Sequence, residues 1–168
     1  MDEIAAASGL TKPAVYRVFR SKRALYDAVA EWYIDQTVGD VLVVAAQDLG
    51  FDEFLATAVA SVVSRVRRDE AVYRFLLRQA RIELASADAA GPDYVAMLAE
   101  RVTPVVADRL AAAGSDPAIA GPLTHAVVGL VNGVAGWSIE QDERSAAMGS
   151  AVAASVLARG LRGLTAEG

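Results

Sequence analysis

Residue types that carry chemistry are scarce in this chain of 168 residues. There is no cysteine, which excludes disulfides, thiol nucleophiles and thiolate metal sites. His125 is the single histidine, so no histidine pair can hold a metal, and no partner for a general base is evident. The acidic pairs 52–53, 69–70 and 142–143 are sequence neighbours on different helix faces, and helix capping accounts for them. We therefore expect no catalytic residue, no metal, no cofactor and no enzymatic activity.

Long hydrophobic runs are also few. The first residues lack the basic and apolar regions of a signal peptide. Segment 117–139 contains no Asp, Glu, Lys or Arg and is long enough to span a bilayer. However, Pro122, His125 and Asn132 interrupt it, and small residues alternate with large ones, which favours a buried helix of a soluble protein. We expect a cytoplasmic protein with no membrane partner.

The first 25 residues have the pattern of two short helices joined by a tight turn. Thr11 suits the N-cap of the second helix, and Pro13 suits its first turn. The spacing predicts that Val15, Val18 and Phe19 point inward. The outward positions are then Lys12, Pro13, Ala14, Tyr16 and Arg17. This is the layout of a helix-turn-helix with a short reading helix.

The same stretch has a distinctive charge. Residues 12–23 contain five cations and no carboxylate, although the chain has a net charge of -5 (Lys12, Arg17, Arg20, Lys22 and Arg23). A local basic patch on an acidic protein marks where a polyanion would dock. A solvated helical face is the alternative, but a patch on the reading helix favours DNA.

The run Gly9-Leu-Thr-Lys-Pro-Ala-Val-Tyr-Arg-Val-Phe-Arg-Ser-Lys-Arg-Ala-Leu25 resembles the DNA-binding segment of the tetracycline-repressor (TetR) family of transcriptional regulators. The common features are a small-residue turn, a Tyr in the reading helix and a Lys that opens the next helix. The resemblance implies an all-α, dimeric repressor of operator DNA, released by a small apolar ligand. Its helix-turn-helix head and connecting helix would occupy residues 1–38, and its helical ligand-binding and dimerisation body residues 39–168.

The family pattern also implies roles for single residues. Lys12, Pro13 and Tyr16 would face base edges or the sugar-phosphate wall, with Ala14 on the same side. Thr11 and Lys22 would hold phosphates, and helix geometry adds Arg17 to the contact set. Family members have another helix before the motif, so we expect an incomplete head. The alternative is a helical dimerisation module that does not bind DNA.

Later segments show helical spacing with more ambiguous roles, and Asp116 followed by Pro117 predicts an N-cap with proline at the first helical position. Pro104 is expected to kink its helix, either beside a pocket or following the shape of the core. Pocket candidates are aromatic, flexible or singly polar residues, each with a core role as the alternative. They are Phe54, Tyr73, Leu76, Tyr94, Met97, His125 and Trp137.

The last two predicted helices are rich in small residues, which let helices approach closely. Such packing could occur within one subunit or across the twofold axis of a homodimer. The candidate positions are Gly129, Gly133, Ala151, Val152, Ser155 and Val156. Nearer the head, a helix capped by Ser21 is expected to bury a stripe that includes Leu25, Val29, Trp32 and Tyr33. A break or bend is expected at Gly39, with residues 41–46 as a continuation of the helix.

Overall fold

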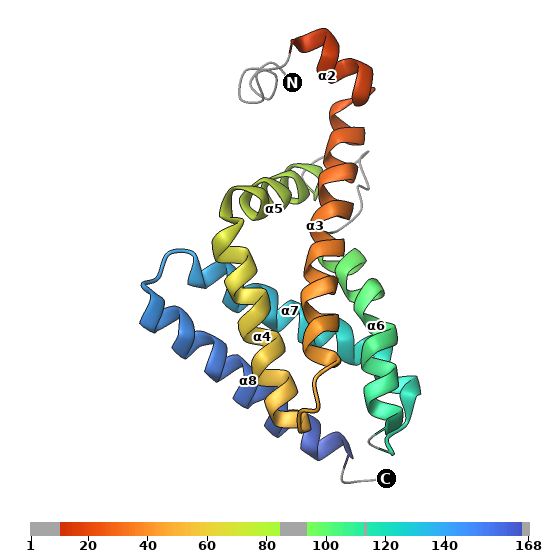
Figure 1. Cartoon of the computed structure of the whole chain (residues 1–168), viewed down its shortest axis with the longest axis vertical. Coiled ribbons are helices and arrows are strands. Elements are labelled where there is room, and N and C mark those ends of the chain that lie inside the picture. The colour runs from red at the N-terminus through yellow and green to blue at the C-terminus, as the bar shows by residue number, and fades with distance from the viewer. Residues whose placement is uncertain (1–10, 85–93, 113, 166–168) are drawn as a thin grey trace.

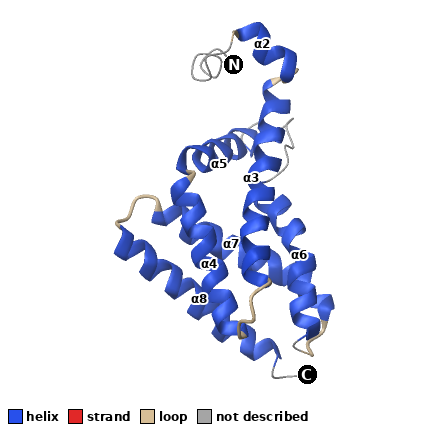
Figure 2. Ribbon diagram, viewed as in Figure 1, coloured by secondary structure: helices blue, strands red, loops and turns tan. Residues whose placement is uncertain are grey.

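The computed structural model describes residues 11–84, 94–112 and 114–165, and this part of the chain is helical and contains no strand (Figures 1 and 2). The predicted all-α fold is confirmed. The elements are α2 (Lys12–Val18), α3 (Lys22–Ala45), α4 (Phe51–Arg68), α5 (Glu70–Leu84), α6 (Tyr94–Ala112), the 3-10 turn η1 (Pro117–Ile119), α7 (Ala120–Ser138) and α8 (Glu143–Thr165).

Helix α3 runs along most of the long axis of the molecule (Figure 1). Its N-terminal end carries α2 away from the other helices, and its C-terminal half packs against α4 and α6. Helix α7 packs against α4 and α6, and α8 packs against α4 and α7. The short helix α2 therefore stands at the tip of a helical body.

Polar side chains begin several helices as the sequence predicts. Ser21 Oγ accepts a hydrogen bond from the Ala24 amide at 3.0 Å, and Asp116 Oδ1 accepts one from Ala118 at 2.9 Å. Asp142 Oδ1 accepts one from the Ser145 amide at 2.7 Å, which lowers the pKa of that carboxyl. Thr11 occupies the N-cap of α2 but makes no side-chain capping bond.

Helix α3 is continuous through Gly39 to Ala45, so the expected break is wrong and the expected continuation beyond residue 41 is confirmed. Backbone hydrogen bonds on both sides of one glycine hold a helix whose neighbours pack it along its length. The buried face agrees with the expected stripe at Leu25 and Tyr33 but not at Trp32, which is about half exposed. It also includes Ile34, which is fully buried. The helix therefore presents Tyr26, Ala30, Tyr33, Ile34, Thr37, Val41 and Val44 to the body.

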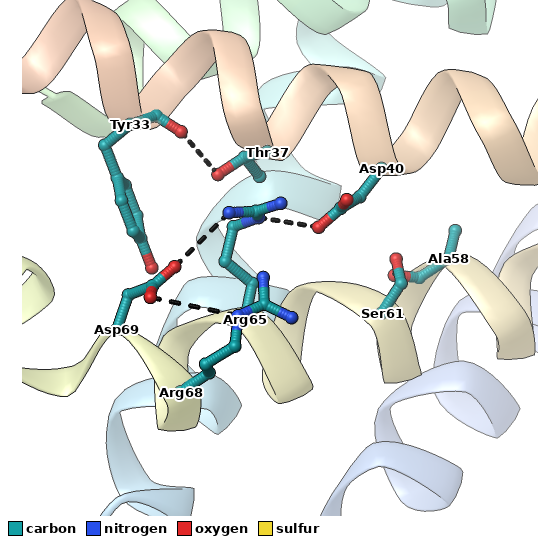
Figure 3. A network of polar contacts seen from close by, with 8 residues as sticks. All are labelled: Tyr33, Thr37, Asp40, Ala58, Ser61, Arg65, Arg68 and Asp69. Carbon is teal, nitrogen blue, oxygen red and sulfur yellow. Dashed lines mark hydrogen bonds and ion pairs between the residues drawn. The ribbon is translucent and has the colours of Figure 1, made fainter.

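A buried arginine fastens α3 to the body (Figure 3). Arg65 on α4 donates to Asp40 Oδ2 of α3 at 2.6 Å and to Asp69 Oδ2 at 3.2 Å, at the joint between α4 and α5. Its side chain is only 9% exposed. The hydrogen bond to Asp40 raises the pKa of the guanidinium, so the cation is retained. One side chain thus links α3 to α4 and to the residue that joins α4 to α5.

Residues Pro117–Ser138 form the one described helical stretch that is long and apolar enough to cross a membrane, by length and composition. Only one face of α7 is buried, through residues spaced three or four apart. The expected burial therefore holds for one face of α7, whereas Gly129, Gly133 and Trp137 on the opposite face are exposed.

Candidate nucleic-acid interface and ligand cavity

Helix α2 presents most of its side chains to solvent. Pro13 lies in its first turn, and Tyr16 and Arg17 are exposed, Tyr16 by 43%. Ala14 is half-buried, and Thr11 precedes the helix as an exposed N-cap. Lys12 begins the helix, but its side chain lies outside the described residues. The outward face predicted for α2 thus contains an aromatic ring and a cation beside the N-terminal turn.

The inward face of α2 differs from the prediction at one position. Val15 is buried as expected and Phe19 is half-buried, whereas Val18 is 69% exposed. Helix α2 has only seven residues and ends at Val18, and Phe19 is already extended with a φ of -115°. Helical spacing therefore no longer governs which side chains share a face at this end.

The N-terminus of α3 adds further cations next to α2. Lys22 is exposed as the first residue of α3, and the first turn contains no acidic residue. Arg23 forms an ion pair with Asp27, one turn later, at 2.7 Å. The helix N-terminus has the partial positive charge of the macrodipole, so this charge and the Lys22 ammonium together favour an anion here. Together, α2 and this end of α3 form a basic tip on an acidic protein.

Inside the body, helices α3, α4, α6 and α7 enclose a cavity of about 110 Å³. Its wall is almost entirely aliphatic and aromatic, and valine is its commonest residue. The lining residues are Thr37, Val41, Phe54, Leu55, Ala58, Val59, Val62, Val66, Tyr94, Leu98, Val102, Val106, Arg109, Leu110, Leu123, Val127, Val128, Val131 and Asn132. A wall of this kind suits an apolar ligand.

A few polar groups lie in the apolar wall or directly behind it. Burial raises the pKa of the Tyr94 hydroxyl, and its hydrogen bond with Thr37 opposes part of that shift. The Tyr73 hydroxyl lies 3.0 Å from both the main-chain oxygen and Oδ1 of Asn132, and burial raises its pKa to about 12. The Arg109 guanidinium lies over the Phe54 ring, 4.8 Å from its centroid. Both tyrosines therefore stay neutral at physiological pH.

Two of the seven pocket candidates, Phe54 and Tyr94, line this cavity. Tyr73 contacts it indirectly through Asn132, while Leu76 and Met97 pack in the core away from it. The remaining two face solvent, because α7 turns their side chains away from the body. His125 is exposed, with Nδ1 3.1 Å from the Gly121 carbonyl, and Trp137 is about half exposed.

Sequence reasoning missed most of the wall. It favoured aromatic and flexible side chains, whereas the wall is made of valines that four helices bring together. Val102 and Val106, on either side of Pro104, belong to it. The helix α6 continues through that proline. Among the polar residues of the wall, Asn132 could have been found from the sequence, because it is an amide in an apolar segment that contains no charged residue.

All six positions considered for dimerisation are exposed (Gly129, Gly133, Ala151, Val152, Ser155 and Val156). A side chain added at Gly129 or Gly133 would meet nothing within 4 Å, so packing within the subunit does not require glycine there. Gly136 differs, because a Cβ there would lie 3.1 Å from the Tyr73 hydroxyl oxygen. Met148, Val152 and Val156 form an exposed apolar stripe along α8.

Among residues 11–84, 94–112 and 114–165, no cluster of three His, Cys, Asp or Glu side chains could hold a metal ion. The two features that the geometry does provide are a basic helical tip and an apolar cavity. A nucleic-acid contact and the uptake of a small molecule are the chemistries that they suit.

Comparison with known families agrees with the geometry of the tip. Residues 1–29 match the family model for bacterial regulatory proteins of the tetR family. A comparison with curated proteins returned no match. The match spans the helix-turn-helix pattern and the basic start of α3. Residues 1–29 are therefore similar to a family of DNA-binding transcription regulators, and residues 30–168 lie outside the match.

Proposed function

We propose that the chain is a cytoplasmic, sequence-specific repressor, and that a small apolar ligand in the cavity releases it from operator DNA. The observation that carries this proposal is the continuity of α3. Its first residue, Lys22, adjoins the reading helix, while Thr37 and Val41 of the same helix line the cavity. Lys22 and Thr37 are about 22 Å apart along α3 at the rise per residue of an α-helix. A ligand that displaces the wall therefore moves a rigid element attached to the head.

The direction of control follows from linkage. A ligand favours the conformation that it binds better, and if that conformation binds operator less well, ligand and DNA weaken each other by the same factor. Helix α3 is held by Arg65 at Asp40, which directly precedes the cavity residue Val41 and lies about one turn after Thr37. Because the ion pair fixes α3 at Asp40, a small shift of the cavity wall would move the rest of the helix and so reach the tip.

On DNA, we propose that α2 is the reading helix. Tyr16 and Pro13, with Lys12 and Ala14, would meet base edges or the sugar-phosphate wall, and Thr11, Arg17 and Lys22 would contact phosphates. The exposure of the ring of Tyr16 and of the cations beside it supports this assignment.

A homodimer would place two such heads on successive major grooves, about 34 Å apart. The exposed small and apolar residues of α7 and α8 support a twofold contact through these helices. Trp137 of α7 lies against Gly149 of α8, since a Cβ at that glycine would meet the indole ring at 2.6 Å. The exposed surfaces of the two helices are therefore continuous.

The proposal is tested by measuring duplex binding by fluorescence anisotropy as a function of salt. A duplex selected for binding serves as operator, and a random duplex serves as the non-specific reference. Tyr16→Ala is expected to abolish the preference for the selected duplex, and Arg17→Ala to weaken both complexes and reduce the salt slope by about 1. Circular dichroism should report unchanged helix content.

Arg74→Ala is the matched control, because this arginine is an exposed cation on α5 in a surface ion pair with Glu70. It should leave both complexes unchanged. Selective binding that survives Tyr16→Ala would refute the assignment of α2 as the reading helix.

A further inference from the structure

We propose that the cavity takes a small amphipathic monocarboxylate, with its carboxylate held by Arg109 and its apolar body among the valines. This inference rests on the proposed function, because it specifies the effector of the same cavity. The observations that carry it are the charges around the cavity, its size and the surroundings of one guanidinium.

Arg109 is the one charged residue among those that line the cavity, and no carboxylate lines it. An apolar wall with a single cation raises the affinity for one sign of ligand charge, since nothing in the wall repels an anion. A cationic ligand would be repelled by Arg109 and would find no carboxylate in the wall. Neutral ligands would leave the guanidinium without a counter-ion.

Several arginines of the described body form ion pairs, whereas Arg109, like Arg67, bonds to main-chain oxygens. Arg65, Arg74 and Arg101 each form an ion pair with a carboxylate. Arg109 instead donates to the main-chain oxygen of Ala45 and stacks on Phe54, with no carboxylate within 4 Å among the residues that the structure describes.

A structural role accounts for part of this geometry. Arg109 lies in the last turn of α6, where the helix dipole favours a cation, and its bond to Ala45 ties α6 to the end of α3. A guanidinium nevertheless has five N–H donors in a planar fork, which suits a carboxylate in bidentate geometry. The Phe54 ring on which it stacks itself lines the cavity, so the cation lies next to the space that a ligand would fill.

The size of the cavity limits the apolar body of the ligand. An engineered apolar cavity of about 150 Å³ binds benzene. The cavity described here, about 110 Å³, suits a body of comparable or slightly smaller size before side chains move. A chain of about six carbons is accordingly a suitable probe.

Hexanoate and hexanol provide a matched pair of probes, because they have the same carbon number and differ in charge. Titration calorimetry on the whole chain should give at least about tenfold tighter binding of hexanoate, as expected for a hydrogen bond to a charged group. Arg109→Gln should remove this preference and change hexanol affinity by less than about threefold. Arg109→Lys should retain part of it, because the charge remains but the planar fork is lost.

Two further variants test whether the probes bind in the cavity and whether the preference for hexanoate arises at Arg109. Arg101→Gln removes a cation from the same helix at an exposed position outside the cavity, and hexanoate affinity should not change. Ala58→Leu fills part of the cavity and should weaken both probes. Thermal unfolding of every variant checks that the fold is intact, and the comparison of the two probes on the unaltered chain does not depend on any variant.

Equal affinity for the two probes, a preference that survives Arg109→Gln, or no detectable binding of either probe would overturn the proposal. Operator binding separates this outcome from failure of the proposed function. If hexanol but not hexanoate weakens the DNA complex, the carboxylate assignment fails and ligand release stands. If hexanoate binds in an Arg109-dependent way without affecting DNA affinity, the carboxylate assignment stands and ligand release fails.

Discussion

The ion pairs of Arg65 connect the head-bearing helix to the body through one side chain. The arginine is 9% exposed, and its partners Asp40 and Asp69 are 33% and 22% exposed. Replacing it with Met would leave Asp40 without its counter-ion, and Asp69 with only the longer contact to Arg68 at 3.8 Å, in a partly desolvated site. We expect Arg65→Met to lower the free energy of unfolding by about 2 kcal/mol, measured by urea denaturation.

The control for this substitution is Arg74→Met, which breaks an exposed ion pair with Glu70. Exposed pairs contribute little because water screens them, and the expected change is below about 0.5 kcal/mol. Equal losses for the two variants would mean that Arg65 contributes no more than a surface cation.

Two buried tyrosines provide a second test at this scale. The Tyr33 hydroxyl is buried without a hydrogen-bond partner in the described structure, whereas that of Tyr73 lies 3.0 Å from two Asn132 oxygens. Removing an unsatisfied hydroxyl should stabilise the fold, and removing a satisfied one should destabilise it. Tyr33→Phe is expected to raise the free energy of unfolding by about 1 kcal/mol and Tyr73→Phe to lower it by a similar amount. Chemical denaturation should therefore give shifts of opposite sign, and shifts of the same sign would contradict this reasoning.

At the scale of the element, the helices differ in how they use glycine. A Cβ at Gly39 of α3 would meet nothing within 4 Å, whereas at Gly136 of α7 it would press on the buried Tyr73 hydroxyl at 3.1 Å. Alanine is favoured over glycine in a helix by about 0.5–1 kcal/mol. Gly39→Ala should therefore raise the melting temperature, while Gly136→Ala should lower it because Tyr73 is held by Asn132. A lower melting temperature for Gly39→Ala would indicate that α3 must bend at that residue.

At the scale of the whole molecule, the surface of α8 bears on assembly. Val152 is 57% exposed in the middle of the apolar stripe with Met148 and Val156. If this stripe is the twofold contact of the proposed homodimer, Val152→Glu places two charges near the axis and should shift the chain to monomer. Sedimentation equilibrium measures the change. Val43→Glu is the matched control on α3, at 67% exposure, and should leave the assembly unaltered. A dimer that tolerates Val152→Glu would exclude this face.

Local features of this protein followed from its sequence. The helix caps at Ser21, Asp116 and Asp142, the all-α fold and the basic stretch that matches a tetR-family model depend on neighbouring residues, whose spacing is readable without a fold. The outward positions of Tyr16 and Arg17 are of the same kind.

Tertiary structure decided which faces the helices bury and which residues meet across them. Trp32 and Val18 are as apolar as their buried neighbours, and only the position of the packed helices leaves them exposed. The cavity depends on valines from four helices, and Arg109 acquires its place there through Phe54 and Ala45, both more than fifty positions away in sequence. Such contacts arise from packing between distant segments, for which helical periodicity carries no information.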